Sequence, residues 1–293
     1  ALIVAGLLGV EKIGRRRARF HKSGRQLAPI QPQPLSSRQG AAVLLYCLVP
    51  MGLGFLIPLM VLVAPVVLDL SLWSDTGLWR AAAHSLALGG ASAGLVVTLA
   101  TVMVLGLQKT PAAWKKSLLT LTTVGYAFPG AVLGLGILIP LATFDNWLAD
   151  LVFATFRRDP GLLLTGSAGA LIVAYCVRFF AIGVGAAEAG LAAISTNIPL
   201  AASTLGRGPK DILINIYQPL MRGGLASALV LVFVDTVKEL PATLLLRPFN
   251  FDTLSTHVYG QASLENFHGS TPAALLIITL SLGAIFLLAK AHR

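Results

Sequence analysis

The sequence predicts an all-α fold: a polytopic bundle of six transmembrane helices. Of its 293 residues, 56% are hydrophobic and only 12% are charged, and the mean hydropathy is +0.80. A soluble domain carries roughly 25% charged residues, so this chain has too little polar surface to coat a water-soluble globule of its size. Helices are expected because the alternating segments of a membrane barrel are absent and lipid leaves no backbone group unpaired. The composition excludes a soluble enzyme, a disulfide-rich secreted domain and a disordered chain.

The first 40 residues divide into two predicted segments. Residues 1–10, ALIVAGLLGV, are apolar but too few to cross a bilayer, and no initiator methionine precedes them. We interpret them as the tail of a preceding transmembrane helix, and the chain as the C-terminal part of a longer polypeptide. Residues 11–40 are rich in arginine, and a helix there is opposed by Pro29, Pro32 and Pro34. They are predicted to form a basic cytoplasmic linker.

Residues 41–293 are predicted to form the six-span domain. Each predicted span is an apolar stretch of about 20 residues or more. The third contains Pro129 and Pro140, which predict a kink. In chain order the spans cover residues 41–68, 82–107, 117–143, 163–187, 220–246 and 271–290.

The lysines and arginines predict the orientation of the spans. With residues 11–40 in the cytoplasm, alternation places four arginines outside, namely Arg80, Arg157, Arg158 and Arg247, and leaves Lys238 within a span. The other 17 of the 22 basic residues fall inside: Lys12, Arg15, Arg16, Arg17, Arg19, Lys22, Arg25, Arg38, Lys109, Lys115, Lys116, Arg178, Arg207, Lys210, Arg222, Lys290 and Arg293. The C-terminus is therefore expected in the cytoplasm. The basic residues behind the net charge of +10 are thus explained by their position on the cytoplasmic side of the membrane, and no nucleic acid partner is expected.

Motifs that would carry chemistry are absent from the sequence. Cys47 and Cys176 each lie within an apolar run, and no CxxC or Cys/His spacing indicates a disulfide framework or a zinc site. No Gly-Lys pair occurs, which excludes a phosphate-binding loop of the P-loop type. No HExxH, GxSxG or paired catalytic carboxylates stand out. We therefore assign no catalytic residue, no firm metal ligand and no cofactor bound by this chain.

The loop after the fourth span, residues 188–219, is the most informative segment. Its sequence, EAGLAAISTNIPLAASTLGRGPKDILINIYQP, is too polar and too interrupted to cross the membrane. A short helix is predicted over residues 199–205, stopped by Gly206, and Pro209 at a first helical position starts another turn. Such a knob on the membrane face is able to dock in a groove on a soluble partner. An interfacial linker helix is the alternative interpretation.

This segment resembles the cytoplasmic coupling loop of binding-protein-dependent ABC transporter permeases. The pattern of that family is E-A-A, three residues, G, nine residues and I-x-L-P. The residues that match it at the right spacing, and that the resemblance implies as ATPase-coupling residues, are Ala201, Ala202, Gly206, Ile216 and Pro219. Leu200 replaces the glutamate and Gln218 replaces the leucine of the pattern.

A second segment is more specific. Residues 237–254, VKELPATLLLRPFNFDTL, resemble the exit of the fifth span in the ferric-iron importer subfamily, in which two six-helix halves are often fused on one chain. The resemblance implies the permease of an ATP-driven ferric-iron importer of the bacterial inner membrane, of which this chain is the C-terminal half.

The resemblance also implies partners. They are a separate ABC ATPase dimer that binds the ATP and magnesium, a periplasmic or lipid-anchored substrate-binding protein, and a second permease half, the missing N-terminal part. The chain itself is then no enzyme.

Two groups of polar residues are candidate sites. Asp235, Lys238 and Glu239 share one helix face at i, i+3 and i+4, and they are predicted either to line the translocation path or to form a self-satisfied structural cluster. On the outside loop, a short helix is predicted over residues 253–265. Its candidate contacts with the binding protein are His257, Tyr259 and Glu265, the alternative being a solvated loop helix.

Ferric iron prefers carboxylate and phenolate oxygens. Candidate ligands are Asp235, Glu239, Tyr126, Tyr175, Tyr259 and Glu265. Three alternatives remain open at this point. The same machinery could carry thiamine, a polyamine, a phosphonate or sulfate. A secondary transporter driven by an ion gradient is a second class, against which the missing inverted repeat counts. A membrane enzyme is the third.

Overall fold

A computed structural model describes residues 35–158, 160–195 and 197–291, and all regular structure in these ranges is helical. The chain divides into two compact units, Ala1–Phe55 and Leu56–Arg293. The described part of the first unit contains helix α2, Ser37–Met51, and all but the last residue of the π-helical turn η1, Gly52–Leu56. A capping box between Ser36 and Gln39 starts α2 within the range predicted as linker. Residues 1–10 and most of the predicted linker lie outside the described residues.

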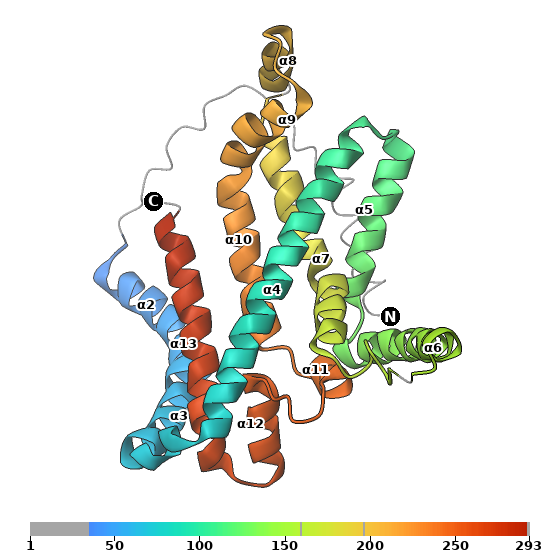
Figure 1. The fold of residues 1–293 in the computed structure, drawn as a ribbon. Coiled ribbons are helices and arrows are strands. Elements are labelled where there is room, and N and C mark those ends of the chain that lie inside the picture. Colours follow the sequence, from blue (N-terminus) through green and yellow to red (C-terminus); the bar gives the residue numbers. More distant parts are fainter. Residues whose placement is uncertain (1–34, 159, 196, 292–293) are drawn as a thin grey trace. The chain divides into compact units, whose positions relative to one another are not determined.

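The second unit is a succession of helices with short connections (Figure 1). In order they are α3 (Ile57–Leu68), η2 (Leu70–Ser74), α4 (Thr76–Gly106), η3 (Leu107–Lys109), α5 (Ala112–Ala127), α6 (Gly130–Phe156), α7 (Ala168–Ala192), α8 (Asn197–Thr204), α9 (Pro209–Ile212), η4 (Leu213–Tyr217), α10 (Gln218–Val237), α11 (Pro241–Leu246), α12 (Leu254–Ser263) and α13 (Phe267–Ala291).

The predicted all-α fold with six candidate spans is confirmed. Six stretches of the described residues are helical, long and apolar enough to cross a membrane: Ser37–Leu68, Thr76–Gly106, Gly130–Phe156, Ala168–Ala192, Pro209–Val237 and Phe267–Lys290. Apart from the third, they begin four to eleven residues away from the predicted starts, because caps and not hydropathy decide where a helix begins. Asp75, for example, accepts a hydrogen bond from the amide of Gly77 and starts α4 at Thr76.

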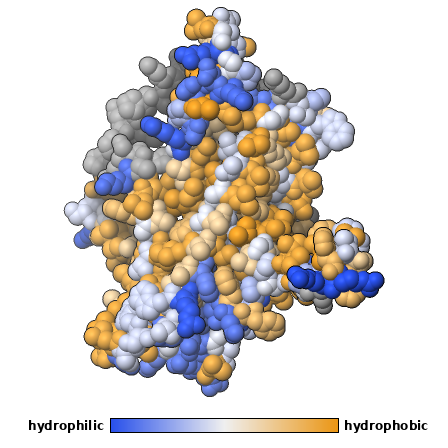
Figure 2. All heavy atoms as spheres, viewed as in Figure 1, coloured by the Kyte–Doolittle hydropathy of each residue, from blue (hydrophilic) through white to orange (hydrophobic). Residues whose placement is uncertain are grey.

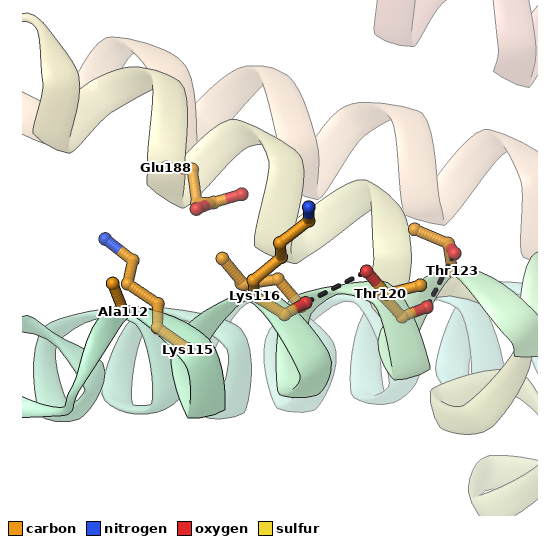
Figure 3. Close-up of a pocket in the computed structure, with 7 residues that line it drawn as sticks. Ala112, Lys115, Lys116, Thr120, Thr123 and Glu188 are labelled. Atoms are coloured by element: carbon orange, nitrogen blue, oxygen red, sulfur yellow. Dashed lines mark hydrogen bonds between the residues drawn. The ribbon is translucent and has the colours of Figure 1, made fainter.

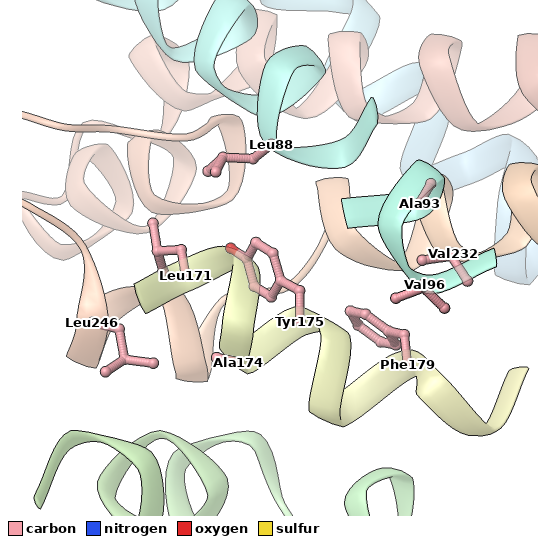
Figure 4. Close-up of a cluster of buried hydrophobic side chains, with 9 residues drawn as sticks. All are labelled: Leu88, Ala93, Val96, Leu171, Ala174, Tyr175, Phe179, Val232 and Leu246. Carbon is pink, nitrogen blue, oxygen red and sulfur yellow. The ribbon is translucent and has the colours of Figure 1, made fainter. Parts of the chain in front are cut away.

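Helices α4, α7 and α10 pack against one another and form the core. Figure 4 shows the buried side chains at their meeting point, which come from these three helices and α11: Leu88, Ala93, Val96, Leu171, Ala174, Tyr175, Phe179, Val232 and Leu246. Small residues let the helices approach closely. A Cβ on Gly183 of α7 would lie 2.9 Å from Val96 Cγ1 of α4.

The predicted third span, residues 117–143, is wrong. Helix α5 ends at Ala127, Phe128 and Pro129 are extended, and α6 begins at Gly130. A proline disfavours the helical conformation of the residue before it, and Phe128 is extended, so Pro129 separates two helices where the sequence predicted one kinked helix. Hydropathy alone does not detect this break, because both sides of it are apolar.

Helix α6 satisfies the length and hydropathy of a span, but the path of the chain places it differently. Helices α5 and α7 run in opposite directions, and both meet α6 at the end of the bundle where α11 and α12 lie (Figure 1). Helix α6 therefore begins and ends at that same end, where it contacts α11. The chain crosses between the two ends of the bundle through α5, which has only 16 residues.

We call the end with α8 and α9 the inner end, and the end with α6, α11 and α12 the outer end. In Figure 2, hydrophilic residues gather near both ends, and apolar residues cover the surface between them. Of the basic residues that were predicted inside and that the structure describes, most lie in elements of the inner end, such as Lys115 at the start of α5 and Lys290 at the end of α13. Arg178 is an exception, because it lies in the middle of α7.

Candidate functional site

The connection between α7 and α9, residues 193–208, projects at the inner end, and we call it the coupling knob (Figure 1). It contains α8, which is close to the predicted helix 199–205. Gly206 has φ +80°, a left-handed conformation that favours glycine. The amide of Gly206 donates to the carbonyl of Ser203, and the amide of Arg207 donates to the carbonyl of Ala202, both at 3.0 Å. These bonds form a Schellman motif, so the predicted helix stop at Gly206 is confirmed.

The five residues that match the coupling pattern do not all lie in the knob. Ala201, Ala202 and Gly206 do, and of these Ala202 is buried. Ile216 lies in η4 and Pro219 in the first turn of α10, within the helical stretch Pro209–Val237 that forms the fifth candidate span. The predicted loop 188–219 is therefore too long: α7 continues to Ala192, and the helical stretch into α10 begins at Pro209.

The tip of the knob exposes apolar side chains at a hydrophilic end of the bundle. Leu205 is 83% exposed and Leu200, which replaces the glutamate of the pattern, is 62% exposed. Ile198 is exposed as well. The main tertiary contact of α8 is with α9, and the nearby ion pair between Arg207 and Asp211 (3.3 Å) is exposed. An apolar surface of this kind is typical of a protein contact.

Two cavities open near the inner end, and the larger of them borders the knob. The larger, of about 1190 Å³, lies between the ends of α4 and α7, the knob and α9, and apolar residues line most of it. The smaller, of about 460 Å³, lies between α5 and α7. In Figure 3 the side chains of Lys115 and Lys116 rise from α5 on either side of Glu188 of α7. The inner end therefore combines basic charge with open space under the knob.

The second candidate site is a polar junction inside the bundle. It centres on an ion pair between Arg178 of α7 and Glu239, whose Nε and Oε2 atoms are 3.0 Å apart and whose side chains are only 19% and 7% exposed. Arg178 Nη1 also donates to the carbonyl of Phe128, at 3.1 Å, in the break between α5 and α6. Glu239 Oε1 accepts from the amide of Ala242 (3.3 Å), in the first turn of α11.

Hydroxyl groups complete this junction. The carbonyl of Glu239 accepts hydrogen bonds from Thr243 Oγ1 at 2.6 Å and from Ser255 Oγ at 2.8 Å. The hydroxyl groups of Tyr175 and Thr243 lie 2.6 Å apart, which makes a second link between α7 and α11. Gly130 packs directly against the ion pair, since a Cβ there would lie 2.5 Å from Glu239 Oε1. We call Phe128, Gly130, Tyr175, Arg178, Glu239, Thr243 and Ser255 the buried polar junction.

The three residues predicted to share one helix face are divided by the structure. Asp235 and Lys238 form an ion pair of 2.7 Å on a partly exposed surface, with the Lys238 side chain 57% exposed. Glu239 pairs with Arg178 instead. Helix α10 ends at Val237, so the helical spacing that relates residues 235 and 239 no longer applies at Glu239. The predicted neutralisation of one carboxylate by Lys238 is confirmed for Asp235.

Arg178 was the main residue that sequence reasoning missed, because it was counted with the inner loops. The signal was present: an arginine in the middle of an apolar helix is costly in lipid and needs a partner. The lone Glu239 at the end of the fifth span was the matching signal. Only the fold shows that these two residues, far apart in sequence, meet.

The outer candidate residues differ in accessibility. The predicted surface helix is confirmed as α12. Tyr259 and Glu265 are exposed, whereas His257 is largely buried, with Nε2 3.6 Å from Asp75 Oδ2.

Other contacts at the outer end hold the segment before α12. His84 stacks on Phe251 with ring centroids 3.9 Å apart, and Ser85 Oγ accepts from the amide of Leu254 at 2.7 Å. Arg247 pairs with Asp252 in the same segment. Nearby, the hydroxyl and amide of Ser71 donate to Asp69 and lower the pKa of its carboxyl.

The candidate iron ligands do not come together into one centre. Tyr175 is buried in the junction, whereas Tyr126 is exposed on α5. Within the described residues, no group of three or more His, Cys, Asp or Glu side chains is arranged to hold a metal ion.

Sequence comparison finds transport permeases among the proteins that are similar to this chain. No family model matches the chain. It is 32% identical over 160 residues to the Fe(3+)-transport system permease protein FbpB 2 of Haemophilus influenzae, over 55% of this chain and 29% of that protein. It is 24% identical over 204 residues to the putative 2-aminoethylphosphonate transport system permease protein PhnV of Salmonella typhimurium, over 70% of this chain and 71% of that protein. The chain thus spans under a third of the length of the first relative.

Solved structures show the same fold. A bacterial alginate ABC transporter, in complex with its alginate pentasaccharide-bound periplasmic protein, superposes with a TM-score of 0.69 at 15% identity, over 86% of this chain and 93% of that chain. The inward-facing MetNI methionine ABC transporter superposes with a TM-score of 0.51, also at 15% identity, over 73% of this chain and 92% of that chain. This chain has the fold of an ABC transporter permease. Its knob and its buried junction are therefore parts of a helical bundle with this fold.

Proposed function

We propose that this permease chain is the membrane-spanning half of an ATP-driven importer, and that its cargo is ferric iron. The observation that carries the proposal is the coupling knob: a short helix stopped by Gly206 that exposes Leu200 and Leu205 at the inner end. It connects α7 directly to the helical stretch that leads into α10, and both helices belong to the core. A knob joined to two packed helices is a suitable lever for an external motor.

In this proposal the chain performs no chemistry. A separate ABC ATPase dimer binds ATP and magnesium, closes, and moves the knob through Ala201, Ala202 and Gly206. Ile216 and Pro219 lie in the helical stretch that carries this motion into α10. The path then opens outward, and hydrolysis resets it. Two such permease halves enclose the path, and the second half is the N-terminal part of the same polypeptide.

Cargo arrives from a periplasmic or lipid-anchored binding protein at the outer end. We propose that Tyr259 of α12 and Glu265 just after it, which are both exposed, contact that protein, and that the largely buried His257 supports the helix.

Asp235 and Lys238 form a partly exposed ion pair near the end of α10. Ionisable groups at such depth face water or a partner in membrane proteins, so we place this pair on the path between the halves. The membrane is the bacterial inner membrane, with the C-terminus in the cytoplasm.

The cargo has one serious alternative. Similarity to a ferric-iron permease at 32% identity and the motif in residues 237–254 support ferric iron. The similarity to PhnV covers more of both chains, which favours a phosphonate. A carboxylate-lined or phenolate-lined path suits a hard cation, whereas a phosphonate requires basic groups. Thiamine, polyamines and sulfate have no comparable support.

Uptake into proteoliposomes tests this function. The complete permease is reconstituted with its ATPase and binding protein, and radiolabelled ferric iron and 2-aminoethylphosphonate are offered separately. Uptake of iron that needs internal ATP supports the proposal, and uptake of the phosphonate alone supports the alternative cargo. Uptake driven by an ion gradient without the ATPase would contradict the importer mechanism itself.

A further inference from the structure

We propose that Arg178 and Glu239 are positioning residues that carry the movement of the coupling knob to the outer end of the path. This inference rests on the proposed transport function. The pair touches no known cargo, and its importance comes from the elements that it joins. These elements include α7 and α10, which lie on either side of the knob. They also include the break between α5 and α6 and the break between α10 and α11.

The first step concerns the two helices on either side of the knob. Arg178 belongs to α7, which enters the knob, and Glu239 follows α10, which leaves it. Arg178 is ten residues from the outer start of α7, or roughly 15 Å at 1.5 Å per residue. The ion pair of 3.0 Å therefore ties α7 to the outer end of α10, deep inside the bundle. When the knob moves, these two helices move together.

The second step concerns the break between α5 and α6. Because α5 ends at Ala127, the carbonyl of Phe128 has no place in a helical hydrogen-bond pattern. Arg178 Nη1 supplies its donor at 3.1 Å. Gly130, the first residue of α6, packs against Glu239 and Arg178 so closely that a Cβ would lie 2.5 Å and 3.1 Å from their polar atoms. One guanidinium thus holds both Glu239 and the start of α6.

The third step concerns the break between α10 and α11. The carboxylate of Glu239 accepts from the amide of Ala242 in α11, and its carbonyl accepts from Ser255 in α12. Irregular backbone inside a membrane protein is tolerated where protein groups satisfy it, and here one residue satisfies several groups at once. A movement that α7 and the end of α10 share therefore reaches α6, α11 and α12, which form the outer end.

The guanidinium has the geometry for this task. Its planar fork faces two partners: Nη1 donates to the carbonyl of Phe128, and Nε lies 3.0 Å from Glu239 Oε2 in an ion pair. A lysine ammonium acts instead as a point charge on a flexible stem. Arg178→Lys keeps the positive charge but loses the planar fork. It therefore distinguishes a positioning role of Arg178 from a role in neutralising the charge of Glu239. Glu239→Gln makes the complementary change, because it keeps an oxygen that can accept from Ala242 and removes the charge that holds Arg178.

The test measures how strongly the cargo-loaded binding protein stimulates ATP hydrolysis in the reconstituted complete transporter. Basal hydrolysis without binding protein and assembly by size exclusion are recorded for each variant. For Glu239→Gln we expect normal assembly and basal hydrolysis, with stimulation and uptake reduced at least about fivefold. For Arg178→Lys we expect a smaller reduction in the same direction. Asp150→Asn, which removes an exposed carboxylate of α6, is the matched control and is expected to behave as the unchanged protein.

A double substitution sharpens the test. If the pair acts as a unit, Arg178→Met combined with Glu239→Gln lowers stimulation no further than Glu239→Gln alone, and additive losses would contradict this. Full stimulation in both Glu239→Gln and Arg178→Lys overturns the inference. If Glu239→Gln fails to assemble, Arg178→Lys decides alone. An unchanged transporter that shows no ATP-dependent uptake overturns the proposed function instead, so the two failures are distinguishable.

Discussion

The coupling knob and the buried polar junction lie at different depths of the same two helices and are built in opposite ways. The knob is held mainly by backbone bonds between neighbours in sequence, such as the bonds that end α8 at Gly206, and it leaves apolar side chains exposed. The junction is held by side chains from four separate elements, and its charges are nearly inaccessible. A surface that meets a partner can be formed by one short segment and stay exposed, whereas a point that joins several helices lies inside the bundle. Changes in the junction should therefore affect stability as well as the transmission of movement, whereas changes in the knob should affect coupling with a smaller loss of stability.

The largest effect is expected from breaking the junction on one side. Arg178→Met leaves the Glu239 carboxylate buried without its ion-pair partner, which should lower the free energy of unfolding by about 3–5 kcal/mol. Thermal unfolding of the purified protein in detergent measures this. The double variant Arg178→Met with Glu239→Gln should recover part of the loss, because no unpaired charge remains. A single variant as stable as the unchanged protein would mean that the pair is not buried as described.

The next effect concerns Asp145 of α6, which is fully buried and accepts hydrogen bonds from the amides of Leu163, Leu164 and Thr165 at 2.7–2.9 Å. Asp145→Ala removes the acceptor for all three amides and should cost about 2–3 kcal/mol in the free energy of unfolding. Asp150→Ala, an exposed carboxylate on the same helix, is the control and should change little. Equal melting temperatures for the two variants would argue against this anchor of α6.

A smaller loss of stability is expected in the knob. Gly206→Val forces a branched residue to φ +80°, which costs about 1–2 kcal/mol locally, and it should uncouple ATP hydrolysis from transport while the bundle stays folded. Gly208→Val is the matched control, since Gly208 has φ −75° and open space around its Cα. Hydrolysis and uptake are measured side by side. Coupled transport in Gly206→Val would count against the knob as the coupling element.

The smallest change in stability is expected at the tip of the knob. Leu205→Asp replaces an exposed side chain and should alter the free energy of unfolding by less than about 0.5 kcal/mol. It should nevertheless weaken binding of the ATPase, measured by co-purification at increasing salt, because an apolar contact is replaced by a charge. Leu264→Asp, at an equally exposed leucine of the outer end, is the control. If both variants retain the ATPase equally, the tip is not the contact surface.

Local signals in the sequence account for much of this result. The helical class, the six candidate spans, the stop at Gly206 and the helix over residues 254–263 follow from hydropathy and from capping or turn residues. The third span was misplaced because Pro129 lies between two apolar segments, and an apolar window looks the same whether its helix continues or turns. Glu239 was assigned to a helix face because the end of α10 at Val237 has no glycine to mark it.

The sequence by itself determined which segments are helical and apolar, where the basic charge gathers, and which connection resembles a coupling loop. These properties depend on residues within a few positions of one another. Only the tertiary structure decided that α6 stays at the outer end, and that Arg178, Phe128 and Glu239 meet. The reason is physical: a buried charge requires a partner, but the requirement does not say which one. The packing of α4, α7 and α10 brings that partner within 3.0 Å.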